Sequence, residues 1–122
     1  MKIEREQSGG RNAFTGYGTG YVEVSGTRYS ESLVVSADRI VADWPAQSVE
    51  ALSADHIAAI VELRPEIVLI GTGASFQFPD QVLLAPLHKA GIGVEVMDTR
   101  AACRTYNILL GEGRNVAAAL IL

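Results

Sequence analysis

The sequence predicts a single three-layer α/β domain, in which N-terminal antiparallel hairpin strands join a parallel βαβαβ unit in residues 66–122. The first observation behind this prediction is Ile67–Ile70, an unbroken apolar run that ends at Gly71. Short runs of this kind are typical of parallel strands buried on both faces. The second observation is that Val94–Met97 repeats the pattern, and that a segment with helical spacing of apolar residues follows each run.

Composition limits what the chain can do. Its 122 residues are enough for one domain, and a net charge of −4 without a Lys/Arg cluster argues against general nucleic-acid binding. No apolar run approaches the roughly 20 residues that span a bilayer, and residues 1–12 lack the hydrophobic core of a signal peptide. Cys103 is the single cysteine, so an internal disulfide and a multi-cysteine metal site are excluded. The sequence therefore indicates a cytoplasmic protein with no membrane span.

The N-terminal third is predicted to hold an arm and a hairpin. Residues 1–13 are polar, and we expect them to form an arm outside the domain, which spans residues 14–122. Tyr21–Val24 alternates between apolar and polar residues, and Ser25-Gly26 suits a two-residue turn. The second strand of this hairpin is predicted to run through Thr27–Val35.

A short strand and a first helix are expected next. The strand covers residues 39–42 and ends before Pro45, which cannot donate to a ladder. Trp44 is expected to cover the core. Residues 53–64 have apolar positions at helical spacing, and Ser53 is a suitable N-cap.

Two further helices and a last strand complete the predicted domain. Residues 79–90 form one helix with Pro79 in the first helical position. The other helix covers residues 100–110, with Thr99 as its N-cap. Val116–Leu122 could be a strand or the end of a helix, and we predict a strand because it would complete the last crossover.

Glycine and polar residues collect where the predicted parallel strands end. Ligands of open α/β sheets bind outside the carboxyl ends of the strands, so this edge is the candidate ligand or partner surface. Its members are Gly71, Thr72, Gly73, Ser75, Asp98, Thr99, Arg100, Arg104 and Asn107. Backbone N–H groups of the glycine turn could hold an anion. The favoured alternative is that the glycines only let the chain turn tightly.

The helix at residues 100–110 carries a polar row opposite its apolar face. Arg100, Arg104 and Asn107 follow one another at i, i+4 and i+7. A cation in the first turn of a helix opposes the helix dipole. We therefore expect Arg100 to have a partner, which could be Asp98, Glu95, a bound anion or an acidic protein surface.

Catalytic and metal-binding patterns are missing from the sequence. Ser75 lacks the GxSxG context of a nucleophile elbow, and Cys103 lies among apolar residues of a helix. His56, His88 and Cys103 do not have the spacing of a metal site. We predict no catalytic residue, no metal and no cofactor, so an enzyme is the less favoured class.

Several motifs together resemble a known family. Residues 69–113 read LIGTGASFQFPDQVLLAPLHKAGIGVEVMDTRAACRTYNILLGEG, and GYVEVSGTRYSESLVV precedes them. With GTG at 71–73, MDTRAACRTYN at 97–107 and GEGR at 111–114, most of the domain resembles a small family of unknown function. That family includes mitochondrial complex I assembly factor 3 and bacterial and archaeal relatives. The resemblance implies a three-layer α/β fold and, for mitochondrial members, a helper role in complex I assembly.

Two functions follow from the sequence. The first is a non-catalytic accessory or assembly protein that binds a protein partner through the surface near residues 71–76 and 98–107. The alternative is an enzyme that binds a small molecule or anion with Gly71, Gly73, Asp98 and Arg100. A deep concave site at the strand ends would favour the enzyme, and a flat or filled edge would favour the interaction protein.

Overall fold

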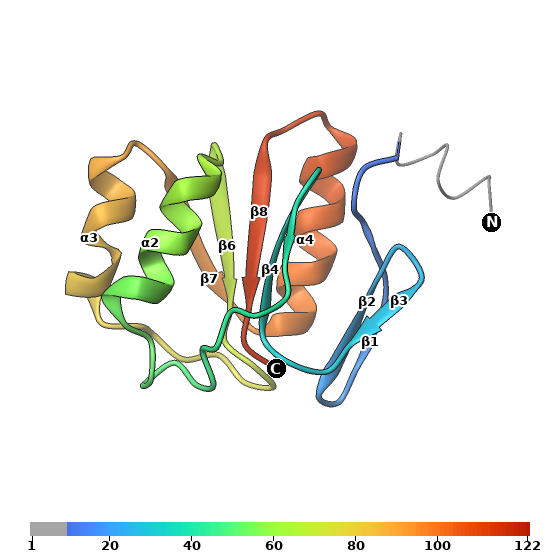
Figure 1. Ribbon diagram of the computed structural model, residues 1–122, viewed down its shortest axis with the longest axis horizontal. Coiled ribbons are helices and arrows are strands. Elements are labelled where there is room, and N and C mark those ends of the chain that lie inside the picture. The colour runs from blue at the N-terminus through green and yellow to red at the C-terminus, as the bar shows by residue number, and fades with distance from the viewer. Residues whose placement is uncertain (1–9) are drawn as a thin grey trace.

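The computed structural model describes residues 10–122, which form a five-stranded sheet, three helices and a separate three-stranded sheet (Figure 1). The large sheet has the order β5-β4-β8-β6-β7. Its strands are β4 (Leu33–Ser36), β5 (Ile40–Val41), β6 (Ile67–Gly71), β7 (Gly93–Met97) and β8 (Val116–Leu120). Strand β6 pairs in parallel with both β7 and β8, so the predicted βαβαβ unit is confirmed. Strand β4 is antiparallel to β5 and β8.

Helices cover both faces of the large sheet (Figure 1). They are α2 (Ala54–Leu63) and α3 (Gln81–Lys89) on one face and α4 (Thr99–Gly111) on the other. Val68 of β6 packs into the core under α2 and α3, and the next residue, Leu69, packs under α4. Both side chains are fully buried. The prediction that β6 is buried on both faces is therefore confirmed.

The small sheet holds β1 (Phe14–Gly18), β2 (Tyr21–Val24) and β3 (Thr27–Tyr29) in antiparallel order. The predicted strand Thr27–Val35 is wrong, because the chain leaves this sheet after Tyr29 and enters the large sheet as β4. All four residues of β4 are buried. A hairpin with one solvated face cannot bury every side chain of a strand, whereas the inside of the large sheet can.

The small sheet lies beyond α4 and is tied to it (Figure 1). The Phe14 ring meets the Tyr106 ring edge-on, with centroids 5.1 Å apart. The Tyr106 hydroxyl donates to the Asn12 carbonyl at 2.8 Å. Residues 1–9 of the predicted arm lie outside the described residues, and Asn12 is attached to the domain.

The helix starts follow the capping rules with two corrections. Ser53 caps α2 as predicted. Asp80 caps α3, so Pro79 precedes the helix instead of opening it. Asp98 caps α4, and the predicted cap Thr99 is the first helical residue. In both cases an aspartate carboxylate accepts a first-turn N–H. Its negative charge also interacts more favourably with the positive end of the helix dipole than a proline or a hydroxyl does.

The two edges of the large sheet differ in length. Strand β5 has two residues, Ile40 and Val41, both half-buried, and β7 has five. A two-residue edge offers little backbone for pairing with another chain, which is one way that proteins protect an edge.

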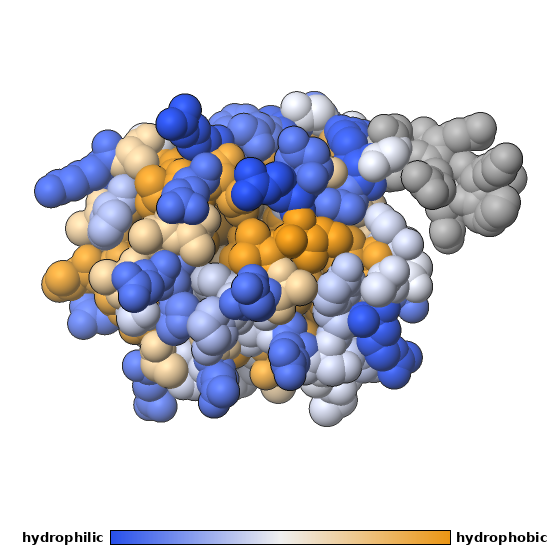
Figure 2. Space-filling model, viewed as in Figure 1, coloured by the Kyte–Doolittle hydropathy of each residue, from blue (hydrophilic) through white to orange (hydrophobic). Residues whose placement is uncertain are grey.

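Apolar surface gathers near the middle of the face drawn in Figure 2, in front of β4 and α4 of Figure 1.

Candidate functional site

The carboxyl ends of β6 and β7 meet the start of α4 at one edge of the sheet. The Thr72 N–H donates to the Met97 carbonyl at 2.9 Å, and the Thr99 N–H donates to the Gly73 carbonyl at 2.9 Å. Gly73 returns its own N–H to the Thr99 hydroxyl at 2.8 Å. The structure therefore brings residues 71–73 and 98–99 together.

Gly71 and Gly73 have different reasons to be glycine. A Cβ on Gly71 would lie 2.8 Å from Leu120 Cδ2 and 3.0 Å from Thr99 Cα, so α4 could not approach the end of β6 as closely. Gly73 has a φ of +98°, which side chains disfavour. Close packing and turn geometry account for both glycines.

Three backbone donors at this edge are already used. The N–H groups of Thr72, Gly73 and Thr99 each bond inside the chain. The first turn of α4 is served by Asp98, whose carboxylate accepts the Ala101 N–H at 2.9 Å. An anion held by the N–H groups of Thr72, Gly73 or Thr99 would have to displace an existing hydrogen bond.

Two buried threonine hydroxyls hold the edge together. Thr99 Oγ1 donates to the Ile121 carbonyl at 2.7 Å, which fixes the segment after β8. Thr72 Oγ1 donates to the Ser75 carbonyl at 2.7 Å and accepts the Gln77 N–H at 3.2 Å. The second pair of bonds closes a compact loop after β6.

The polar row on α4 divides into bonded and unbonded members. The Asn107 amide donates to the Phe14 carbonyl at 2.7 Å and accepts the Phe14 N–H at 2.9 Å. Arg104 donates to the Tyr17 hydroxyl at 3.1 Å, a hydrogen bond that raises the pKa of the guanidinium. Arg100 is exposed and forms no ion pair with any residue of the described chain, so neither Asp98 nor Glu95 is its partner.

The one thiol of the chain is not a nucleophile in this fold. Cys103 is fully buried on α4. Burial raises the pKa of its thiol to about 12, against the smaller opposing effect of the Arg104 guanidinium. The thiolate needed for attack or metal binding is therefore disfavoured near neutral pH. Residues 10–122 contain no group of three His, Cys, Asp or Glu side chains placed to hold a metal.

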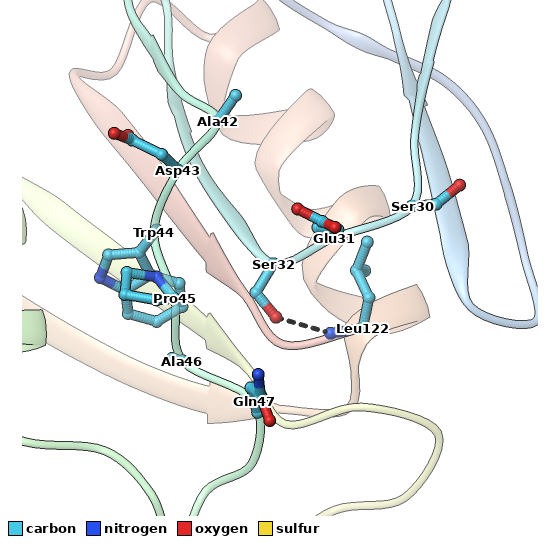
Figure 3. Close-up of a pocket in the computed structure, with 10 residues that line it drawn as sticks. All are labelled: Ser30, Glu31, Ser32, Ala42, Asp43, Trp44, Pro45, Ala46, Gln47 and Leu122. Atoms are coloured by element: carbon cyan, nitrogen blue, oxygen red, sulfur yellow. Dashed lines mark hydrogen bonds between the residues drawn. The ribbon is translucent and has the colours of Figure 1, made fainter.

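A cavity of about 410 Å³ opens at the same edge, where β8 ends and β4 begins (Figure 3). Its walls come from residues 30–32, residues 42–47 and Leu122. Glu31 and Asp43 are its charged lining residues. None of the candidate residues chosen from the sequence lines this cavity. The sequence offered only one signal for it, the Trp44-Pro45 pair that follows a short strand.

The surface predicted near residues 71–76 ends at Phe76, but sequence reasoning did not single out Phe76 and Phe78 as a pair of exposed phenylalanines. Phe76 is 49% exposed and Phe78 is 72% exposed, and their rings meet edge-on with centroids 4.7 Å apart. Val82, at the start of α3, is 78% exposed. A signal was present, because Phe-Gln-Phe lies in a segment with neither a buried-strand run nor helical spacing.

Comparison with known proteins places the chain in a family. The family model described as "Protein of unknown function (DUF498/DUF598)" matches residues 14–121. The chain belongs to this family. The family resemblance predicted from the motifs is thereby confirmed, and it extends to relatives named as complex I assembly factors.

Three relatives illustrate the range of the family. A crystal structure from Bordetella parapertussis is 41% identical with a TM-score of 0.85, and the match covers 91% of this chain and 95% of that one. The "13 kDa major membrane protein" of Francisella tularensis is 30% identical over 99% of each chain. The human "NADH dehydrogenase [ubiquinone] 1 alpha subcomplex assembly factor 3" is 39% identical over 66% of this chain, which spans only 45% of the human protein. Within the described residues, no helix is both long enough and apolar enough to cross a membrane.

Proposed function

We propose that this protein is a non-catalytic accessory factor that binds another protein in the cytoplasm and assists the assembly of respiratory complex I. The names of the mitochondrial relatives support this function, at identities of 31% to 39%. The proposed partner surface is the edge near residues 71–76 and 98–107.

One observation carries the proposal. The polar groups that are buried at this edge, Thr72 and Thr99, are fully engaged in holding the fold. The groups that remain available, including Arg100, lie on the outside. An enzyme needs convergent reactive groups in a sheltered site, whereas a binding protein needs groups presented outward.

The first experiment measures assembly in the native host. Deletion of the gene is expected to lower the amount of assembled complex I on native gels, and the wild-type gene is expected to restore it. The purified wild-type protein should also capture complex I subunits, identified by mass spectrometry. An unchanged amount of complex I after deletion, together with no subunit captured, would rule out this function.

A charge-matched pair of variants tests the proposed surface. Arg100→Gln with Arg104→Gln is expected to weaken capture while leaving folding intact, and wild-type capture should weaken as salt rises. The control changes Arg39 and Lys89 to Gln, which removes the same two charges from exposed positions elsewhere. Equal capture by both double variants would remove the arginine side of α4 from the proposed surface.

The cavity beside β8 supports a second candidate function, binding of a small molecule. Its charged lining is acidic, which favours an amine or another cationic ligand over an anion. Thermal-shift screening of amines against wild type and a Glu31→Gln, Asp43→Asn variant tests this idea. A shift that appears in wild type and disappears in the variant would favour this function over the first.

A further inference from the structure

We propose that Phe76 and Phe78 are anchors that insert into an apolar hollow of a different protein, whose rim carries carboxylates that meet Arg100. This inference rests on the proposed function, because it names the part of the surface that binds and the chemistry of the partner. It concerns the loop between β6 and α3, which runs along the edge of the sheet in Figure 1.

The loop is rigid at both ends, although its phenylalanines face solvent. The Thr72 hydroxyl bonds to the Ser75 carbonyl and to the Gln77 N–H, on either side of Phe76. Beyond Phe78, Pro79 is buried. These partly buried hydrogen bonds fix the backbone on both sides of Phe76, so this part of the contact surface is organised before binding, which lowers the entropic cost of association.

The exposed area shows that the two phenylalanines form one part of a larger contact. Two half-exposed to mostly exposed phenylalanines offer on the order of 200 Å² of apolar surface. Each partner in a stable interface contributes about 800 Å². The pair is too small to hold any partner alone, but it has the size and composition of a hot spot inside a larger interface.

Charge at this edge indicates the rest of the partner's chemistry. The Asp80 and Asp98 carboxylates each accept a hydrogen bond from a helix N-terminus. Arg100 follows Thr99, which is bonded twice to Gly73, so the backbone of Arg100 lies next to the residues from which the loop starts. Arg100 has no carboxylate partner within the described chain. A partner with carboxylates beside its apolar hollow would supply one.

The test begins with a photocrosslinking residue at Gln77, which is exposed and lies between the two rings without replacing either. The matched control position is Ile108, an apolar residue of α4 that is 62% exposed. Benzoylphenylalanine at position 77, expressed in the native host, is expected to give one discrete adduct with a different protein that position 108 does not give. The crosslinked peptide is expected to hold apolar side chains flanked by Asp or Glu.

The identified partner is then purified and its affinity measured. Phe76→Ser with Phe78→Ser is expected to weaken binding at least tenfold, and Arg100→Gln at least threefold, while Ile108→Ser leaves it unchanged. All variants should keep the wild-type Tm. A crosslink to a second copy of the chain or to lipid, no discrete adduct, or a partner that binds the phenylalanine variant normally would each overturn the proposal. In the last case the accessory function survives and only the proposed binding surface is wrong. If the wild-type protein captures no complex I subunit, both the accessory function and this surface are contradicted.

Discussion

The two faces of the large sheet are held in different ways. Under α2 and α3 the core is apolar, and the Trp44 indole N–H donates to the His56 carbonyl at 3.0 Å in a partly buried hydrogen bond. On the α4 face, side chains of Thr99, Tyr106 and Asn107 reach segments far away in the chain. Apolar packing tolerates small shifts of an element, whereas a hydrogen bond to one backbone group fixes its position. The α4 face is therefore the one that specifies where the small sheet sits.

The largest expected effect comes from the core that both faces share. Leu69→Ala should lower the free energy of unfolding by about 2–5 kcal/mol, because it empties a fully buried site under α4. Val68→Ala, on the other face, removes less volume and should cost less. Urea unfolding monitored by circular dichroism gives both values. A loss below about 1 kcal/mol for Leu69→Ala would contradict the placement of β6 inside the sheet.

The tether to the small sheet is the next target. Asn107→Ala should cost about 1–3 kcal/mol, because the N–H and the carbonyl of Phe14 both lose their partner. Asn107→Asp is the matched variant, since a carboxylate can still accept from the N–H but repels the carbonyl. Hydrogen exchange of the β1 amides should increase in both variants while the α2 amides stay protected. If the β1 and α2 amides instead exchanged equally faster in the variants, the Asn107 side chain would not be what fixes the small sheet on the α4 face.

A pH experiment tests burial on the α4 face. The pKa of Cys103 is about 12 in the folded chain, above the unfolded value of about 8.5. Folding therefore favours the neutral thiol, and this contribution is complete below the unfolded pKa and is lost as pH rises toward the folded pKa. Stability should fall above about pH 9, and Cys103→Ala should fall less steeply. In native protein at pH 8, Cys103 should resist a thiol reagent that labels it fully in urea.

The smallest expected effect is at the exposed Glu66–Arg114 ion pair, whose nearest atoms are 2.8 Å apart. The hydrogen bond from Arg114 lowers the pKa of Glu66, so its contribution is present above the usual carboxyl pKa and is lost as pH falls through the folded value. Water and salt screen such a pair. Arg114→Gln should leave Tm at pH 7 within the error of repeated scans. A larger shift would show that this exposed ion pair contributes more to stability than solvent screening allows.

Local pattern was enough to predict the parallel part of the fold. β6 is a short apolar run, β7 is a strand-like run before Asp98, and the helices between the strands show regular spacing, so these elements could be recognised without their neighbours. β8 also needed its neighbours, because its apolar run fits a strand or a helix end and the expected crossover decided between them. The split between β3 and β4 could not, because the partner that draws Leu33 into the large sheet is Leu120, far along the chain.

The candidate site was harder to predict for a related reason. A polar residue at a strand end has the same sequence signature whether it serves a ligand or the fold. Only the partner tells them apart, and the partner of Asn107 is Phe14, at the other end of the chain. For Phe76 and Phe78 the only signal in the sequence was that Phe-Gln-Phe belongs to neither a buried-strand run nor a helical pattern, and this does not say how far each ring is exposed.

The strand order also has a consequence for how the protein is made. β8 lies between β4 and β6, and it is the last strand in sequence. During synthesis on the ribosome, β4 and β6 emerge first and have no common neighbour until residues 116–120 follow. Their unpaired edges stay open for that interval, when pairing with another nascent chain is the competing outcome. We expect the yield of folded protein to depend more on how residues 98–120 are translated, and on chaperones that act at that stage, than on the rate at which β1 to β5 are made.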